Sequence, residues 1–281
     1  MTVINTNINA NIARDAIGRN DRAMATSMER LSTGLRINSA KDDAAGLAIA
    51  NRMAGQISGL NMANRNANDG MSMIQTVEGA TKEVGNMLVR MRELSVQSAS
   101  GTYSDSDRAA LDLEFDQLRS EITRIQEKTT WNNQALMDGG KTVSIQLGAS
   151  SGQTMDVVFA DWSVADTNVY GTAAGSETSV DAISIHDAAG ASAAITTLDK
   201  AISGVTAEQA KYGAYLSRLQ YASDNISNVA TNLDQSRSRI QDADYAVETT
   251  ALARTQIISQ ASTAMLAQAN QAKQGVLSLL R

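Results

Sequence analysis

The sequence IQTVEGATKEVGNMLVRM, residues 74–91, carries the clearest structural pattern in the chain. Its apolar side chains recur at alternating intervals of three and four, and Thr81 divides the longer interval between Val77 and Val84. This spacing is typical of a coiled coil, in which one stripe of a helix packs against a partner helix along its length. The stretch therefore predicts a long helix packed lengthwise against another helix.

The helical spacing extends on both sides of this stretch, so we expect one long helix over residues 42–99. Ser39 followed by Asp42 has the spacing of a helix cap and predicts where the helix starts. The polar run 68–70, which ends in a glycine, predicts an irregularity within it. At 1.5 Å per residue, the helix would be about 85 Å long.

A second helix is predicted directly after a short turn at residues 100–103. Ser104 and Asp107 have the spacing of a capping pair, and Phe115 and Ile122 belong to a new apolar stripe with intervals of four and three. Because the connection is short, we expect this helix to return antiparallel to the long one.

The middle of the chain has a different period. Apolar and polar residues alternate over 142–147 and again over 155–159, on either side of a Gly/Ser-rich turn. Two such runs predict a β-hairpin at about 141–160. Residues 160–192 are rich in Ala, Gly, Ser, Thr and Asp, and we expect them to form a solvent-exposed outer part.

Helical spacing returns at Ile195, with a kink expected at Gly204, and continues as a second three-four seam over 226–240. The predicted fold class is mainly α, with a long antiparallel coiled-coil rod built from both chain flanks and a small β-hairpin region in the middle. We assign residues 45–165 and 190–240 to the rod and residues 166–189 to a short variable outer segment.

The two ends, residues 1–44 and 241–281, carry narrower apolar stripes. An isolated helix with so little apolar surface to bury is marginal in water. We therefore expect the ends to be stabilised mainly by neighbouring subunits. The predicted packing residues are Ile4, Ile8, Ile12, Leu31, Leu35, Val247, Ile258, Met265, Val276, Leu279 and Leu280.

Composition excludes several classes of function. The 281 residues include no Cys and one His, so thiolate chemistry, disulfides and a multi-His metal site are excluded. The formal net charge of −6 argues against nucleic acid as a partner. No run of about 18 apolar residues is present, so we expect no membrane insertion. The N-terminus lacks the basic and apolar regions of a cleaved signal peptide. No cofactor is expected.

Three local motifs could carry chemistry, and each has a structural interpretation that fits better. Residues 135–142, ALMDGGKT, resemble the end of a phosphate-binding loop, but a strand follows where that motif needs a helix. The alternate asparagines at 64–68 lack the Gly and Glu of a calcium loop. His186 has no nucleophile motif near it, so we interpret it as an exposed loop residue. We expect no enzymatic activity.

Several long motifs, in order along the chain, resemble the signatures of bacterial flagellin. The resemblance covers roughly residues 1–140 and 195–281, whereas residues 160–192 match nothing, as is typical of the variable region of this family. The motifs are LSTGLRINSAKDDAAGLAIANR at 31–52, RNANDG at 65–70, RELSVQSA at 92–99, SRIQDADY at 238–245, AQANQ at 267–271 and VLSLLR at 276–281.

The resemblance implies a structural subunit of the extracellular flagellar filament. In the family, terminal helices form the inner core of the tube, and the rod helices with the hairpin form the next shell. The family is exported unfolded through the flagellar type III apparatus. The implied partners are other copies of the chain, an export chaperone, the filament cap and the hook-junction proteins.

The resemblance also implies recognition by Toll-like receptor 5. The family's receptor-contact segment corresponds here to Arg90, Arg92, Glu93 and Leu94, with Glu114 on the returning helix. The tail 276–281 resembles the segment that intracellular inflammasome receptors recognise.

Two other assignments remain open from the sequence. A hook-filament junction protein has similar chain ends. A non-flagellar coiled-coil interaction module would share the rod pattern, but its termini would be ordered in the free protein.

Overall fold

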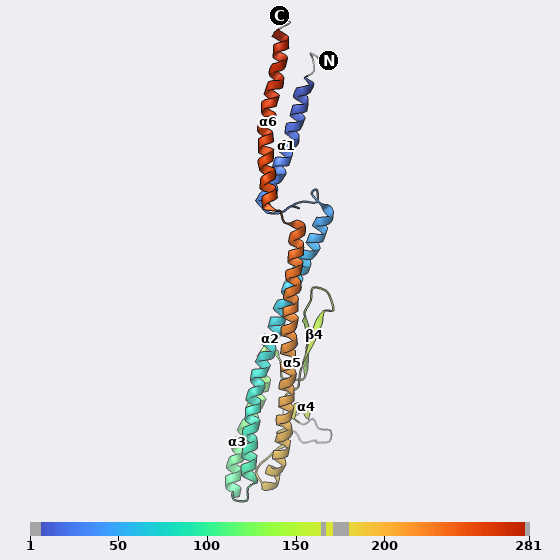
Figure 1. Ribbon diagram of the computed structural model, residues 1–281. Helices are drawn as coiled ribbons and strands as arrows, with labels where there is room; N and C mark the ends of the chain where they lie inside the picture. Colours follow the sequence, from blue (N-terminus) through green and yellow to red (C-terminus); the bar gives the residue numbers. More distant parts are fainter. Residues whose placement is uncertain (1–6, 164–166, 171–179, 279–281) are drawn as a thin grey trace. The chain divides into compact units, whose positions relative to one another are not determined.

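The fold is mainly α-helical with two small antiparallel strand pairs, which confirms the predicted fold class (Figure 1). A computed structural model describes residues 7–163, 167–170 and 180–278, with side-chain burial described as far as residue 271. The chain divides into two compact units. We call residues 1–57 with 231–281 the terminal unit and residues 58–230 the central unit.

The two longest helices, α2 and α5, each contribute residues to both units. The helices are α1 (Ile8–Thr33), α2 (Ala44–Ala99), α3 (Asp105–Lys128), α4 (Thr167–Tyr170), α5 (Ala188–Gln241) and α6 (Tyr245–Ser278), with a short 3-10 helix η1 (Val180–Ala182). The strands are β1 (Thr130–Trp131), β2 (Gln134–Ala135), β3 (Lys141–Gln146) and β4 (Thr154–Phe159).

The helix starts follow from local capping. At α3, the Ser104 side chain accepts from the backbone N–H of Asp107, and the Asp107 carboxylate accepts from the backbone N–H of Ser104, which confirms the predicted cap. At α2 the predicted start, residue 42, was two residues early. Asp42 accepts hydrogen bonds from Ser39 within the preceding turn, and Asp43 caps the helix by accepting from the Gly46 N–H at 2.9 Å.

Helix α2 is continuous from Ala44 to Ala99, so the predicted irregularity at residues 68–70 was wrong. Gly70 has a packing role instead. A Cβ atom there would lie 2.4 Å from Cδ1 of Ile145 on β3, so the missing side chain lets the hairpin approach the helix. Asn66 also donates to the backbone carbonyl of Gln146 on that hairpin.

The expected kink at Gly204 was wrong for a similar reason. Helix α5 passes through this position without a break, and a Cβ atom at Gly204 would lie 1.9 Å from the backbone oxygen of Val169. The glycine therefore lets the short helix α4 lie directly against α5. Close approach between backbones is a common reason for glycine within a helix.

The predicted β-hairpin is confirmed as β3 paired with β4, with Lys141 opposite Phe159 and Gln146 opposite Thr154. Met155, Val157 and Phe159 are buried while the intervening residues of β4 are exposed, as a period of two requires. The sequence analysis missed the smaller pair β1–β2. Its turn residues, Asn132 and Asn133, both have positive φ angles.

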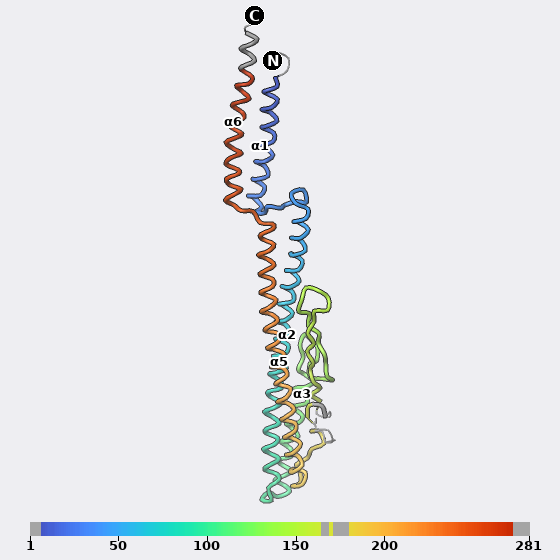
Figure 2. Tube along the Cα trace, turned by 45° about the vertical axis from the view of Figure 1, so that its right-hand side comes forward, coloured from blue at the N-terminus to red at the C-terminus, as the bar shows by residue number. Residues whose placement is uncertain are grey.

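The core of the central unit contains the largest side chains of the protein. Helices α2 and α3 and the N-terminal part of α5 lie side by side in both views (Figures 1 and 2). Leu88, Phe115 and Leu198, one from each helix, are fully buried. We predicted that residues 160–192 would be exposed to solvent. The prediction was wrong for several of the described residues, because their side chains belong to the core. They are Trp162, Val169, Tyr170, Val180, Ile183 and Ile185.

Burial changes the acidity of two tyrosines in this core. Desolvation raises the pKa of Tyr212 to about 12, although its hydroxyl accepts a hydrogen bond from the Trp162 indole N–H at 3.3 Å. The pKa of Tyr170, whose ring contacts Trp162 edge-on, is also raised by burial. Both hydroxyls therefore stay neutral at physiological pH.

Candidate assembly surface

The terminal unit is built on α1 and α6, which lie side by side and antiparallel (Figures 1 and 2). Helix α1 begins at the cap residue Asn7, whose side chain accepts from the Ala10 N–H, and ends at Gly34, whose φ of 72° lies in the left-handed region. Such a residue stops a helix and turns the chain away. At this end, the backbone of Gly34 and Arg36 bonds to that of Ala243 and Gln241.

The interior of this unit is thin. Among the described residues, its buried apolar residues are few, with Ala10, Ile37 and Ala50 below 9% exposure, and its buried polar residues are Asn20, Ser27 and Glu248. A pair that buries mainly small and polar side chains gains little from the hydrophobic effect, because that gain scales with the apolar area removed from water.

Many large apolar side chains of the helix pair are exposed, and others, including Ile17, Leu252 and Leu266, are only half-buried. Ile12 on α1 is 59% exposed and Met265 on α6 is 64% exposed. The other exposed large apolar residues of α1 and α6 are Ile8, Met28, Tyr245, Val247, Ile257 and Ile258. At 100° per residue, Ile8 and Ile12 share one side of α1, and Val247, Ile258 and Met265 share one side of α6. We call these five residues the terminal apolar face. Exposed apolar residues gathered on one side of a helix are typical of interaction sites.

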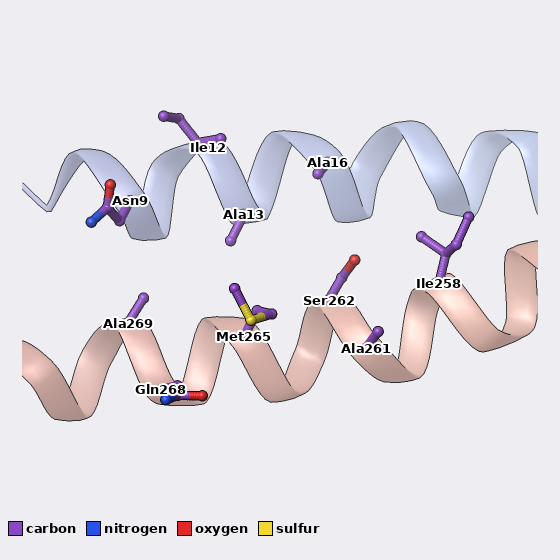
Figure 3. Close-up of a pocket in the computed structure, with 10 residues that line it drawn as sticks. All are labelled: Asn9, Ile12, Ala13, Ala16, Ile258, Ala261, Ser262, Met265, Gln268 and Ala269. Atoms are coloured by element: carbon purple, nitrogen blue, oxygen red, sulfur yellow. The ribbon is translucent and has the colours of Figure 1, made fainter.

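Part of the terminal apolar face lines a groove between the two helices (Figure 3). The groove has a volume of about 630 Å³. Three of the predicted packing residues, Ile12, Ile258 and Met265, line it at different points along its length. Alanines at positions 13, 16, 261 and 269 form its floor and walls with Asn9, Ser262 and Gln268. Small residues let the helices come close, and the three large ones supply apolar contact area.

The other predicted packing residues have different positions. Ile8 and Val247 are exposed, whereas Leu31 and Leu35, at the C-terminal end of α1, are half-buried. Val276 belongs to α6, but its side chain lies outside the described residues. Ile4, Leu279 and Leu280 lie outside the described residues altogether.

The sequence analysis missed the polar contacts that join α1 to α6. Arg30 forms an ion pair with Glu248 at 2.9 Å, and the Glu248 side chain is only 10% exposed. Asn20 donates to the backbone oxygen of Thr255 at 2.7 Å, and Asn7 donates to that of Ala269 at 3.4 Å. Glu248 is one of only four charged residues in 246–281, and this scarcity of charge could have indicated that Glu248 has a specific partner.

The predicted receptor-contact residues lie in the central unit. Arg90 on α2 forms ion pairs with Glu114 on α3 at 2.9 Å and with Glu93 at 3.1 Å. The hydrogen bond to Glu114 makes the largest contribution to raising the pKa of Arg90, and the one to Glu93 adds to it. All three side chains are exposed. Arg92 bonds instead to Asp199 on α5, which raises the pKa of Arg92.

Leu94 differs from the other predicted receptor residues because it is fully buried in the core of the central unit. Its side chain packs between helices and does not reach the surface. The exposed part of the predicted set therefore consists of Arg90, Glu93 and Glu114, and Arg92 is half-buried.

The described residues contain no cluster of His, Cys, Asp and Glu that could hold a metal ion. His186 is exposed on the loop before α5. None of the described helices is both long enough and apolar enough to cross a membrane. The main feature of the protein is thus an apolar surface on a weakly packed helix pair. Surfaces of this kind are typical of structural subunits that assemble.

Comparisons with known proteins identify the family. The bacterial flagellin N-terminal helical region matches residues 4–142, and the bacterial flagellin C-terminal helical region matches residues 195–280. The chain belongs to the bacterial flagellin family and is a structural subunit of the flagellar filament rather than an enzyme.

Two relatives similar in sequence agree with this assignment, and one solved structure is also similar in sequence. The chain is 45% identical to a flagellin of Halalkalibacterium halodurans, with 99% of this chain and all of the relative aligned. It is 40% identical to the flagellar filament 33 kDa core protein of Treponema phagedenis, over 99% of this chain and all of that one. The crystal structure of Bacillus cereus flagellin is 34% identical over 62% of this chain and 94% of its own, with a TM-score of 0.49.

Proposed function

We propose that subunits polymerise through the terminal apolar face. The observation that carries the proposal is the contrast within α1 and α6, where the fully buried residues are small or polar and every large apolar residue of described burial is exposed or only half-buried. Burying one Ile or Met side chain contributes about 1.5–3 kcal/mol. Contact with neighbouring copies would therefore supply the stabilisation that the helix pair lacks.

The contact would be between different surfaces of successive copies. Such head-to-tail contacts generate open helical assemblies when the rotation between copies does not close a ring. The family assignment supports this mode of assembly, and the filament would lie outside the cell.

A single charge in the groove tests the proposal. Replacing Ile258→Asp places a carboxylate where apolar contact is expected, and we predict that the critical concentration for seeded polymerisation rises at least about tenfold, since 1.4 kcal/mol corresponds to a factor of ten. Sedimentation and electron microscopy of seeded samples measure this.

The matched control is Val158→Asp on the β3–β4 hairpin. Val158 is 49% exposed and shares the outer face of β4 with Asp156, so a carboxylate is already tolerated there. This variant should polymerise like the unmodified chain. Equal effects of the two substitutions would contradict the assignment of the terminal apolar face as the assembly surface.

The proposal includes export of the chain in an unfolded state, with an export chaperone, the filament cap and hook-junction proteins as partners. The sequence supports rapid folding after export because it contains no Pro and no Cys. Prolyl isomerisation and disulfide exchange are the slowest common folding steps, and neither can delay this chain.

A second proposed role is recognition by Toll-like receptor 5 at the exposed cluster of Arg90, Glu93 and Glu114. The cross-helix bond between Arg90 and Glu114 supports it, because it presents both charges in a fixed geometry on adjacent helices. Replacing Arg90→Ala should reduce receptor activation in a reporter assay at least tenfold. Arg124→Ala, which removes the exposed Arg124–Glu121 pair on α3, is the control. Equal receptor activation by the unmodified chain, the Arg90→Ala variant and the Arg124→Ala variant would contradict this role.

A further inference from the structure

The polar contacts between α1 and α6 follow one register. Residue numbers in contacting pairs of an antiparallel helix pair add to a nearly constant sum, and here Asn7 with Ala269 gives 276, Asn20 with Thr255 gives 275 and Arg30 with Glu248 gives 278. The three contacts are spaced along α1 from its first turn to its last. They therefore fix the position of one helix along the other over the whole length of α1.

Apolar packing alone would specify this register weakly. The groove is lined mainly by alanines and polar residues, so few large side chains oppose a slip along the helix axis. In the present register Ile12 lies level with Met265, since their numbers add to 277, and a slip by one turn would change this pairing. The register thus determines which large side chains meet in the groove of the terminal apolar face.

We propose that Arg30 and Glu248 are positioning residues for polymerisation, because their ion pair sets the register that determines which large side chains meet in the groove of the terminal apolar face. Among the three polar contacts, this pair alone joins opposite charges, and the Glu248 side chain is largely removed from water. A buried charge without its partner is strongly unfavourable, so slipped registers that separate the two are disfavoured. Buried polar groups fix register in coiled coils in the same way.

The location of each charge strengthens the pair. Arg30 lies in the last turn of α1 and Glu248 lies in the first turn of α6. Cations are favoured at helix C-termini and anions at helix N-termini by the helix dipole. The backbone bonds from Gly34 and Arg36 to Ala243 and Gln241 hold the two connecting segments together, and the ion pair is the first side-chain contact beyond them. It carries the alignment of these segments into the helices.

The inference rests on the proposed function, and its first test is Glu248→Ala in the full-length chain. We expect the critical concentration for seeded polymerisation to rise at least tenfold while the thermal melting of the central unit is unchanged. The control is Arg237→Ala, which removes an ion pair with Asp234 that lies within one helix of the same unit. It should polymerise normally.

A charge exchange tests the pairing itself. The double variant Arg30→Glu with Glu248→Arg should polymerise at a lower concentration than either single change, but not as well as the unmodified chain, because both charges then oppose the helix dipoles. If the double variant is no better than the single variants, the pair does not act as proposed.

An apolar exchange separates register from simple stabilisation. The variant Arg30→Met with Glu248→Leu replaces the ion pair by side chains of similar size that pack in several registers. We expect filaments with poor helical order, seen as weakened layer lines in electron micrographs. Filaments as regular as those of the unmodified chain would overturn the inference.

The outcomes also separate this inference from the proposed function. If Ile258→Asp blocks polymerisation and Glu248→Ala does not, the assembly surface stands and the positioning role fails. If neither change has an effect, the terminal apolar face is not the assembly surface, and the proposed function fails with it.

Discussion

The terminal and central units use similar helices in opposite ways. In the central unit, large side chains such as Leu88 and Phe115 are fully buried, and Trp162, Tyr170 and Tyr212 complete the core. In the terminal unit, mainly small or polar residues are buried, and Ile, Met and Val side chains on α1 and α6 face solvent. The comparison supports the proposal that the central unit is stable alone and that the terminal unit is stabilised by neighbouring copies.

Removing residues 246–281 tests this difference most severely. The truncated chain loses α6 and half of the groove, so we expect no filaments in seeded samples. The helix content per residue and the melting transition of the central unit should be unchanged, because its core contains no residue of the removed segment. Circular dichroism and electron microscopy measure both. Filaments formed by the truncated chain would show that the two units are not specialised as described.

A pair of alanine substitutions compares the two units directly. Leu88→Ala should lower the free energy of unfolding by about 3 kcal/mol, since a leucine buried in a close-packed core leaves a cavity. Ile12→Ala should change it by less than about 0.5 kcal/mol in the free chain, because its side chain is already in water. Urea unfolding monitored by circular dichroism gives both values. Similar losses for both variants would mean that α1 is as well packed as α2.

Glycine substitutions sharpen the account of the central core. Gly204→Ala should destabilise the central unit by about 2 kcal/mol, because the new Cβ atom would lie 1.9 Å from the Val169 carbonyl oxygen. Gly79→Ala on α2 is the control, since a Cβ atom there has nothing within 4 Å. It should stabilise the protein by about 0.5–1 kcal/mol through helix propensity. Thermal unfolding of both variants distinguishes the close approach at Gly204 from the effect of helix propensity. Equal shifts of the two melting temperatures in the same direction would contradict the packing role of Gly204.

A further, modest effect is expected at the start of α3. Ser104→Ala removes one half of the capping box and should cost about 1 kcal/mol. Hydrogen bonds from the Ser104 side chain and backbone hold the pKa of Asp107 below the ordinary aspartate value of 3.8. The stabilisation from Asp107 is therefore present above that value and is lost as the pH falls through its lower folded-state pKa. Urea unfolding at pH 7 and pH 2.5 measures the cap, and a larger effect of Ser104→Ala at pH 2.5 would contradict it.

Much of the fold followed from sequence periodicity. The three-four seams predicted the long helices, and the change to a period of two predicted the hairpin, because these patterns arise from local geometry. The glycines at 70 and 204 were misinterpreted, since their reason is the approach of distant residues, Ile145 and Val169, which no local pattern contains.

The candidate site was predicted less completely. The apolar residues Ile12, Ile258 and Met265 were identified, because exposed stripes at helical spacing are visible in the sequence. The ion pair between Arg30 and Glu248 joins residues 218 positions apart, so it depended on the register of α1 against α6. The burial of Trp162 and Tyr170 was missed because the small, polar residues around them dominate the composition of that segment.

Hydrogen exchange of the free chain and of the filament tests the central claim most directly. We predict that backbone amides of α1 and α6 exchange at least about 100-fold faster in the free chain than in the filament, because local stability there depends on neighbouring copies. Amides of α2 around Val84 and Leu88 should be strongly protected in both states. Equal protection of α1 and α6 in the dilute free chain and in the filament would contradict the account.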